Sequence, residues 1–122
     1  MLKRLLLIAV LLASAVYPGG QGKTIVVTSG TPVQLCSTCN PPKSGVCTVT
    51  ALSSNNGTIF LGFSSAVSAA NKMGTPLGPP VTAGQPGATY TCNPGGNAAI
   101  WSLTSIWLDA TVSGEGVSYS WN

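Results

Sequence analysis

Few side chains in this sequence of 122 residues are able to do chemistry. There is no histidine, so the usual general base near neutral pH is missing and neither a Ser-His-Asp nor a Cys-His arrangement can form. Four cysteines and two carboxylates remain as candidates. They are Cys36, Cys39, Cys47, Cys92, Asp109 and Glu115.

The two carboxylates lie on either side of one predicted turn. A glycosidase pair needs two carboxyl groups about 5–10 Å apart, which such a turn allows. Glu115 stands within Ser-Gly-Glu-Gly, however, which is typical of a solvated turn. We interpret Asp109 as a surface polar residue of a strand, and weak calcium binding is the alternative, although calcium usually takes several carboxylates. The sequence therefore predicts a protein that is not an enzyme and that has no metal site and no cofactor.

The cysteines are expected to form two disulfides, because an exported chain meets oxidising conditions. Four cysteines allow three pairings, and we favour Cys36–Cys47 with Cys39–Cys92, since Cys36 ends one predicted strand and Cys47 begins the next. The Cys36-x-x-Cys39 spacing also suits zinc, but Cys47 and Cys92 are too far apart to form a second pair of ligands. A redox site is disfavoured because the flanking residues start no helix.

The first fifteen residues, MLKRLLLIAVLLASA, have the three parts of a signal peptide. Lys3 and Arg4 are followed by an apolar run over 5–12, and Ala13-Ser14-Ala15 gives a small-x-small cleavage site. The alternative is a membrane anchor, but a span needs about 20 apolar residues. We predict a signal peptide over 1–15, a flexible linker over 16–22, a single domain over 23–122, and no membrane span in the mature protein.

Charge is scarce, at 6% of residues against about 25% in average domains. Beyond the predicted signal peptide only Lys23, Lys43 and Lys72 are basic, and they are scattered along the chain. No basic stripe for nucleic acid results. With so little charge, the surface must rely on hydroxyls, amides and turns for its hydration.

The domain is predicted to be all-β. β-Branched and alternating segments separated by turn residues favour seven strands, with one or two further short pieces within 74–84. The seven segments are 23–28, 31–35, 47–52, 58–63, 88–92, 105–111 and 117–121. Turn signals about every 8–12 residues are typical of an antiparallel β-sandwich, either a jelly roll or an immunoglobulin-like one. Residues 64–71 are the only stretch compatible with a helical turn.

Two hairpins are expected from local signals. Asn56-Gly57 favours a type I′ turn that would pair 47–52 with 58–63. Ser113 to Gly116 favours a turn that would pair 105–111 with 117–121.

The aromatic residues are interpreted mostly as core. Tyr119 and Trp121 alternate with serines and therefore share one face of a strand. Trp101 follows a predicted loop and precedes a serine, so it is the best candidate for an exposed binding aromatic. Together with Tyr90 and Asp109, Trp101 makes up the predicted binding surface.

Segments from residue 29 onward resemble a small β-sandwich domain found in virion proteins of tailed bacteriophages and in prophage-borne proteins. The resemblance lies in Ser29–Leu35, in Asn56–Gly62 with the stretch that follows, and in Ile106–Tyr119. It implies a non-enzymatic decoration or fibre-associated module in a virion. The predicted signal peptide and the cysteine-rich loop depart from that family and favour a secreted or cell-surface location.

The expected function is therefore a structural or interaction module that binds a protein partner or assembles with itself. The alternative is a secreted glycan-binding or adhesion module that uses exposed aromatics.

Overall fold

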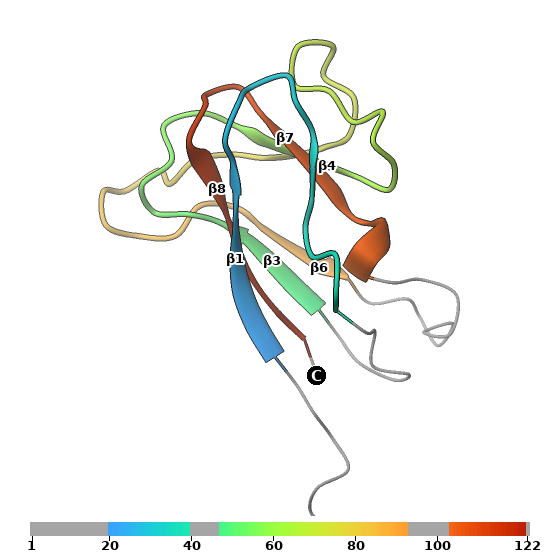
Figure 1. Ribbon diagram of the computed structural model, residues 1–122. Coiled ribbons are helices and arrows are strands. Elements are labelled where there is room, and N and C mark those ends of the chain that lie inside the picture. Colours follow the sequence, from blue (N-terminus) through green and yellow to red (C-terminus); the bar gives the residue numbers. More distant parts are fainter. Residues whose placement is uncertain (1–19, 40–46, 93–102, 122) are drawn as a thin grey trace, which may run out of the picture.

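The computed structural model describes residues 20–39, 47–92 and 103–121 (Figure 1). The predicted signal peptide and Trp101 lie outside these ranges. Within these ranges the chain forms eight strands and one short 3₁₀ turn. They are β1 (Gly20–Val26), β2 (Val33–Gln34), β3 (Cys47–Ala51), β4 (Ile59–Gly62), β5 (Thr75–Leu77), β6 (Thr89–Cys92), η2 (Leu103–Ser105), β7 (Trp107–Ala110) and β8 (Glu115–Trp121).

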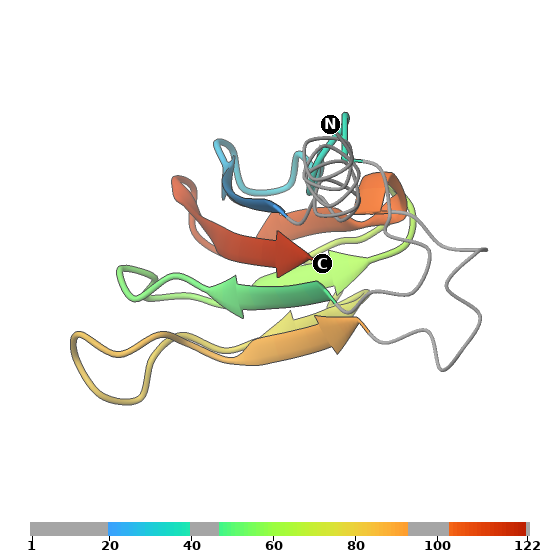
Figure 2. The same ribbon diagram turned by 90° about the horizontal axis from the view of Figure 1, so that it is seen from below.

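The strands form two antiparallel sheets of four strands each, which stack face to face (Figures 1 and 2). Sheet A has the order β1-β8-β3-β6, and sheet B has the order β2-β7-β4-β5. The pairing is nested: β1 pairs with β8, β2 with β7, β3 with β6, and β4 with β5. This is the strand order of a jelly roll, so the sandwich prediction is confirmed and the immunoglobulin-like alternative is set aside.

Both predicted hairpins are wrong. β3 and β4 belong to different sheets, and so do β7 and β8, so the chain crosses from one sheet to the other at each of these turns. Neither Asn56 nor Gly57 adopts the positive φ that a type I′ turn requires. Position 57 has no room for a side chain, because a Cβ atom there would lie 2.3 Å from Thr111 Oγ1. Residues 64–71 also form no helix.

The core lies between the two sheets. Along each strand, every second side chain points inward and contributes to it. β3 shows this alternation, with Cys47, Val49 and Ala51 buried between half-exposed threonines. Leu61 of β4 and Leu108 of β7 are register partners on the inner side of sheet B, and both are fully buried. The largest fully buried side chains include Leu35, Ile59, Leu61, Leu103, Ile106 and Leu108.

All four cysteines are disulfide-bonded, as predicted, but the favoured pairing is wrong. The bonds are Cys36–Cys39 and Cys47–Cys92. Cys47 and Cys92 are register partners in the β3–β6 pair, with their Cα atoms 4.8 Å apart. Cys36 does not lie opposite Cys47, because β2, the strand before Cys36, pairs with β7 and not with β3. With every thiol engaged in a disulfide, no thiolate is left to bind zinc in this state.

β1 begins at Gly20, so residues 20–22 belong to the sheet and not to the predicted linker. The aromatic rings of β8 leave no room for side chains at Gly20 and Gly22 of β1. A Cβ atom on Gly22 would lie 2.4 Å from the Tyr119 hydroxyl oxygen, and one on Gly20 would lie 2.3 Å from the Trp121 ring. Tyr119 and Trp121 stack with their ring centroids 5.9 Å apart, which confirms that they share a face.

Four connections lie together at one end of the sandwich, on the left of Figure 2. They are residues 27–32, 52–58, 78–88 and 111–114. Among the residues described, no helix is long and apolar enough to cross a membrane.

Candidate functional site

The outer face of sheet A is lined by hydroxyl groups. Strand alternation directs the threonines of β3 and β6 and the serines of β8 away from the core. We call these six residues the hydroxyl face. They are Thr48, Thr50, Thr89, Thr91, Ser118 and Ser120.

The strand register places the six hydroxyls in two rows across the sheet. Ser120 is opposite Thr48, which is opposite Thr91. In the same way, Ser118, Thr50 and Thr89 form the second row. Residues two apart along a strand are separated by about 6.5 Å, and neighbouring strands by about 4.8 Å. The result is a grid of hydroxyls, two along each strand and three across.

Most of this grid is open to solvent. Ser118, Ser120, Thr89 and Thr91 are exposed, and the two threonines of the central β3 strand are half-buried. Within the described residues, only one side-chain hydrogen bond forms across the grid, between the hydroxyls of Thr50 and Thr89 at 3.0 Å. The other hydroxyls are therefore able to donate and accept.

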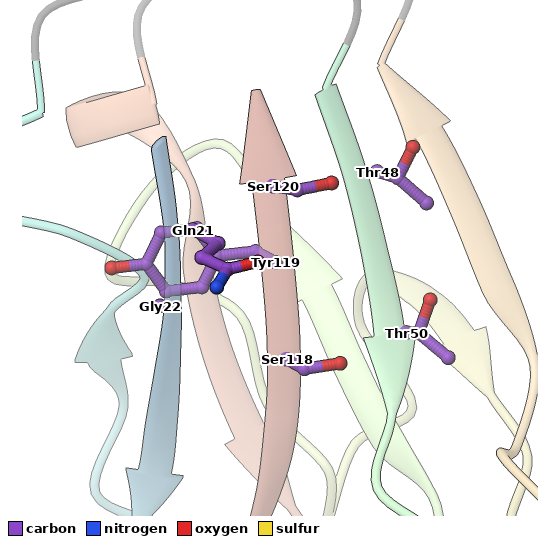
Figure 3. Close-up of a pocket in the computed structure, with 7 residues that line it drawn as sticks. All are labelled: Gln21, Gly22, Thr48, Thr50, Ser118, Tyr119 and Ser120. Atoms are coloured by element: carbon purple, nitrogen blue, oxygen red, sulfur yellow. The ribbon is translucent and has the colours of Figure 1, made fainter. Parts of the chain in front are cut away.

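A shallow depression of about 500 Å³ lies over β1, β8 and β3 (Figure 3). Hydroxyl-face residues of β3 and β8 line it on one side, and Gln21, Gly22 and Tyr119 line it on the other. In Figure 3 the four Ser and Thr side chains project to the same side of the sheet. The depression therefore places the Gln21 amide of β1 beside the hydroxyl face.

The charge of this face is low. Lys23, the register partner of Ser118, is the only charged residue in the strands of sheet A that stands on this side of the sheet. A surface of hydroxyls with one lysine at its border suits a neutral polar partner better than an anionic polymer.

Part of the outer face of sheet B, over β4 and β7, is covered. Residues 63–74, which connect β4 to β5, fold back over it, and we call them the cover loop. Val67 and Ala69 of this loop pack with Phe60 of β4 and against Trp107 of β7 in a second, small apolar cluster. A bridge between Ser68 and Met73 closes the loop on itself.

Asp109 fastens the cover loop to the sheet. The prediction of a surface position is wrong, because the residue is 1% exposed. Its carboxylate accepts hydrogen bonds from the backbone N–H groups of Ala69 (2.8 Å), Gly30 (2.9 Å) and Ala110 (2.9 Å). Its oxygens are therefore used to hold two loops in place and are not presented to a ligand.

Glu115 has the same structural use in the other sheet, and the prediction of a solvated turn is wrong. It is 7% exposed, and its carboxylate accepts from the backbone N–H groups of Asn56 (2.5 Å) and Gly57 (2.9 Å). Beside it, the Asn55 side chain donates to the Gly116 carbonyl at 2.8 Å and accepts from the Gly116 N–H at 3.1 Å. These bonds tie the β3–β4 crossing to the start of β8.

The predicted binding surface is not brought together. Tyr90 is half-buried and packs against the main core from β6, and Asp109 is buried on the far side of sheet B. Trp101 lies outside the described residues. The hydroxyl face was missed as a site, although its signal was present: Thr48 with Thr50 and Ser118 with Ser120 alternate with buried residues in the sequence.

No cluster of three or more metal-ligating side chains occurs within residues 20–39, 47–92 and 103–121. The scan against family models, the search of curated proteins and the search of solved structures found no match to this chain.

Proposed function

We propose that this protein is an exported, non-enzymatic interaction module that attaches to a surface or a larger assembly through its hydroxyl face. The observation that carries the proposal is the contrast between the two outer faces. The cover loop packs on the outer face of sheet B over β4 and β7, whereas the described part of the chain leaves sheet A bare over β3, β6 and β8. A bare, ordered sheet face offers a preformed contact surface at little entropic cost.

The use of both carboxylates supports a role without catalysis. Asp109 and Glu115 are the only acidic residues of the sequence, and each is buried and accepts backbone hydrogen bonds. The two disulfides support export, since such bonds persist in oxidising compartments. The resemblance to phage virion modules remains a prediction, because no relative adds to it.

A neutral glycan is the partner chemistry that the hydroxyl face favours. Hydroxyls donate and accept equally well, and a polysaccharide repeats both functions along its length. This differs from the glycan-binding alternative based on exposed aromatics, because Tyr90 faces the core. Binding that rests on hydroxyls is expected to change little with salt, since few charges take part.

Co-sedimentation with the neutral polysaccharides cellulose and chitin tests the proposal. Removing hydroxyls with Thr48→Val and Ser120→Ala is expected to weaken binding about fivefold each, because a net hydrogen bond contributes about 1 kcal/mol. Ser53→Ala and Ser54→Ala serve as matched controls, since both serines are exposed on the β3–β4 crossing and away from the face. Equal binding by the face variants and the controls would exclude the hydroxyl face as the contact surface.

A further inference from the structure

β6 is the outermost strand of sheet A, on the side opposite to β1 (Figure 2). Among the described residues, β3 is its only strand partner. An edge strand presents unpaired backbone N–H and C=O groups and can pair with a strand of another chain. Proteins usually prevent this with lysine, proline, glycine, a bulge, or a very short strand.

The other three edges of the sandwich carry such features. β2 is only two residues long. β5 has three residues, and Pro76 at its centre has no N–H to donate. β1 carries Lys23 and the two glycines beneath the β8 rings.

β6 carries none of them. Its residues Thr89-Tyr90-Thr91-Cys92 include no charge, no proline and no glycine. All four pair with β3 in an unbroken register. The Cys47–Cys92 disulfide and the Thr50–Thr89 hydrogen bond hold the strand in this position, so it is ordered before any partner arrives.

The local sequence of β6 reads the same in both directions about Tyr90. An antiparallel copy of the strand, related by a twofold axis at Tyr90, places Thr89 of one chain opposite Thr91 of the other. Thr–Thr pairs across antiparallel strands are favourable, and sheet A already contains one between Thr50 and Thr89. Both pairs would lie on the outer face of the sheet.

We propose that β6 binds β6 of a second copy of this chain, which forms a twofold symmetric dimer with one continuous eight-stranded sheet. Twofold pairing uses the same edge on both chains and therefore closes on itself. The two hydroxyl faces become one surface of doubled length, with four threonines meeting at the junction. β1 of each copy remains at the outer ends, where Lys23 and the glycines disfavour further growth.

Sedimentation velocity of the purified protein, with both disulfides intact, tests the proposal over a dilution series. We expect a monomer–dimer equilibrium. Thr91→Lys introduces a charge at the edge and should raise the dissociation constant at least tenfold. Thr48→Lys is the matched control, because it places the same charge in the same row one strand further in, and it should leave the dissociation constant unchanged.

A protein that stays monomeric at every concentration would overturn the proposal. So would dimers that resist Thr91→Lys, or that dissociate equally with Thr48→Lys, since the contact would then lie elsewhere than on the edge. Open-ended polymers would overturn the twofold pairing. Polysaccharide binding by the unmodified protein at concentrations below its dimer dissociation constant would show that the hydroxyl face acts without the dimer, so the two proposals fail separately.

Mixed disulfide trapping tests the register. Thr89→Cys and Thr91→Cys are purified as separate chains and mixed under mild oxidation. The twofold axis at Tyr90 predicts an intermolecular bond between the two different variants and little bonding within either one alone. Equal trapping within a single variant would overturn the register, and mass analysis confirms that the native disulfides stay intact.

Discussion

The two sheets of this sandwich treat their outer faces in different ways. Sheet B packs part of its outer face against the cover loop, with Phe60 and the half-buried Trp107 in an apolar cluster and Asp109 bound to the loop backbone. Sheet A presents the hydroxyl face and holds its strands with the Cys47–Cys92 disulfide. One sheet therefore gains stability from a second layer of packing, and the other gains it from a covalent bond while its surface stays available.

With only 6% charged residues, this chain uses its charged and its uncharged polar side chains for different purposes. The only two carboxylates are buried and satisfy backbone N–H groups of loops, where a charged acceptor makes the strongest hydrogen bonds. Hydration of sheet A is left to hydroxyls.

Removal of the Cys47–Cys92 disulfide by a double Cys→Ala substitution should cost the most. The bond closes a loop with a sequence separation of 45, for which the chain-entropy model gives about 4 kcal/mol. The same change at Cys36 and Cys39 is the control, and its separation of 3 predicts about 2 kcal/mol. Urea unfolding measures both values. Equal losses from the two pairs would contradict the special role of the bond in sheet A.

Asp109→Asn should lower the free energy of unfolding by about 3 kcal/mol, because asparagine keeps only one acceptor oxygen and its NH2 group would face a backbone N–H group that the carboxylate accepted. Hydrogen exchange provides the specific readout. The Ala69 amide, whose acceptor is not the oxygen shared by Gly30 and Ala110, should lose protection, whereas the amides of β3 and β8 should retain it. Unchanged exchange at Ala69 would mean that the cover loop is held by packing alone.

Val67→Ala removes two methyl groups from the small cluster beneath the cover loop. It should cost about 1.5 kcal/mol, since each buried CH₂ contributes about 0.8 kcal/mol. Ala66→Gly, at an exposed neighbouring position, provides a comparison within the same loop. Thermal unfolding measures both variants. A cost for Val67→Ala no greater than that of the neighbour would show that the cluster adds little to sheet B.

Thr48→Val and Ser118→Ala should change stability by less than about 0.5 kcal/mol, because surface substitutions without a packing role have small effects. Each side chain makes no hydrogen bond to the described residues, and valine is well suited to strands. Urea unfolding is the measurement. A cost above about 1 kcal/mol would mean that the hydroxyl face serves the fold and is not free for a partner.

The sequence predicts the strands well because alternation is a local signal. β3 differs from its predicted range only by ending at Ala51, one residue early, and Cys47, Val49 and Ala51 face the core as alternation requires. The side that Tyr119 and Trp121 share follows from the same rule. Local signals of this kind extend only over neighbouring residues.

The pairing of strands was not predictable from those signals. Asn56-Gly57 favours a hairpin in isolation, but Glu115, far along the chain, accepts both of the backbone N–H groups and holds the segment in a crossing between sheets. The disulfide pairing fails for the same reason, because it assumed that neighbours in sequence pair in space. The burial of Asp109 depends on the cover loop, which no periodicity indicates.

The nested pairing of the strands also has a consequence for the order in which the protein is made. β8 is an interior strand of sheet A, between β1 and β3, yet β1 is completed about ninety residues earlier in the chain. A chain that emerges gradually, from a ribosome or through a channel, holds β1 and β3 without their shared neighbour until residues 115–121 arrive. Contacts of such long sequence separation make folding slow. Sheet A therefore cannot be completed until residues 115–121 have been made.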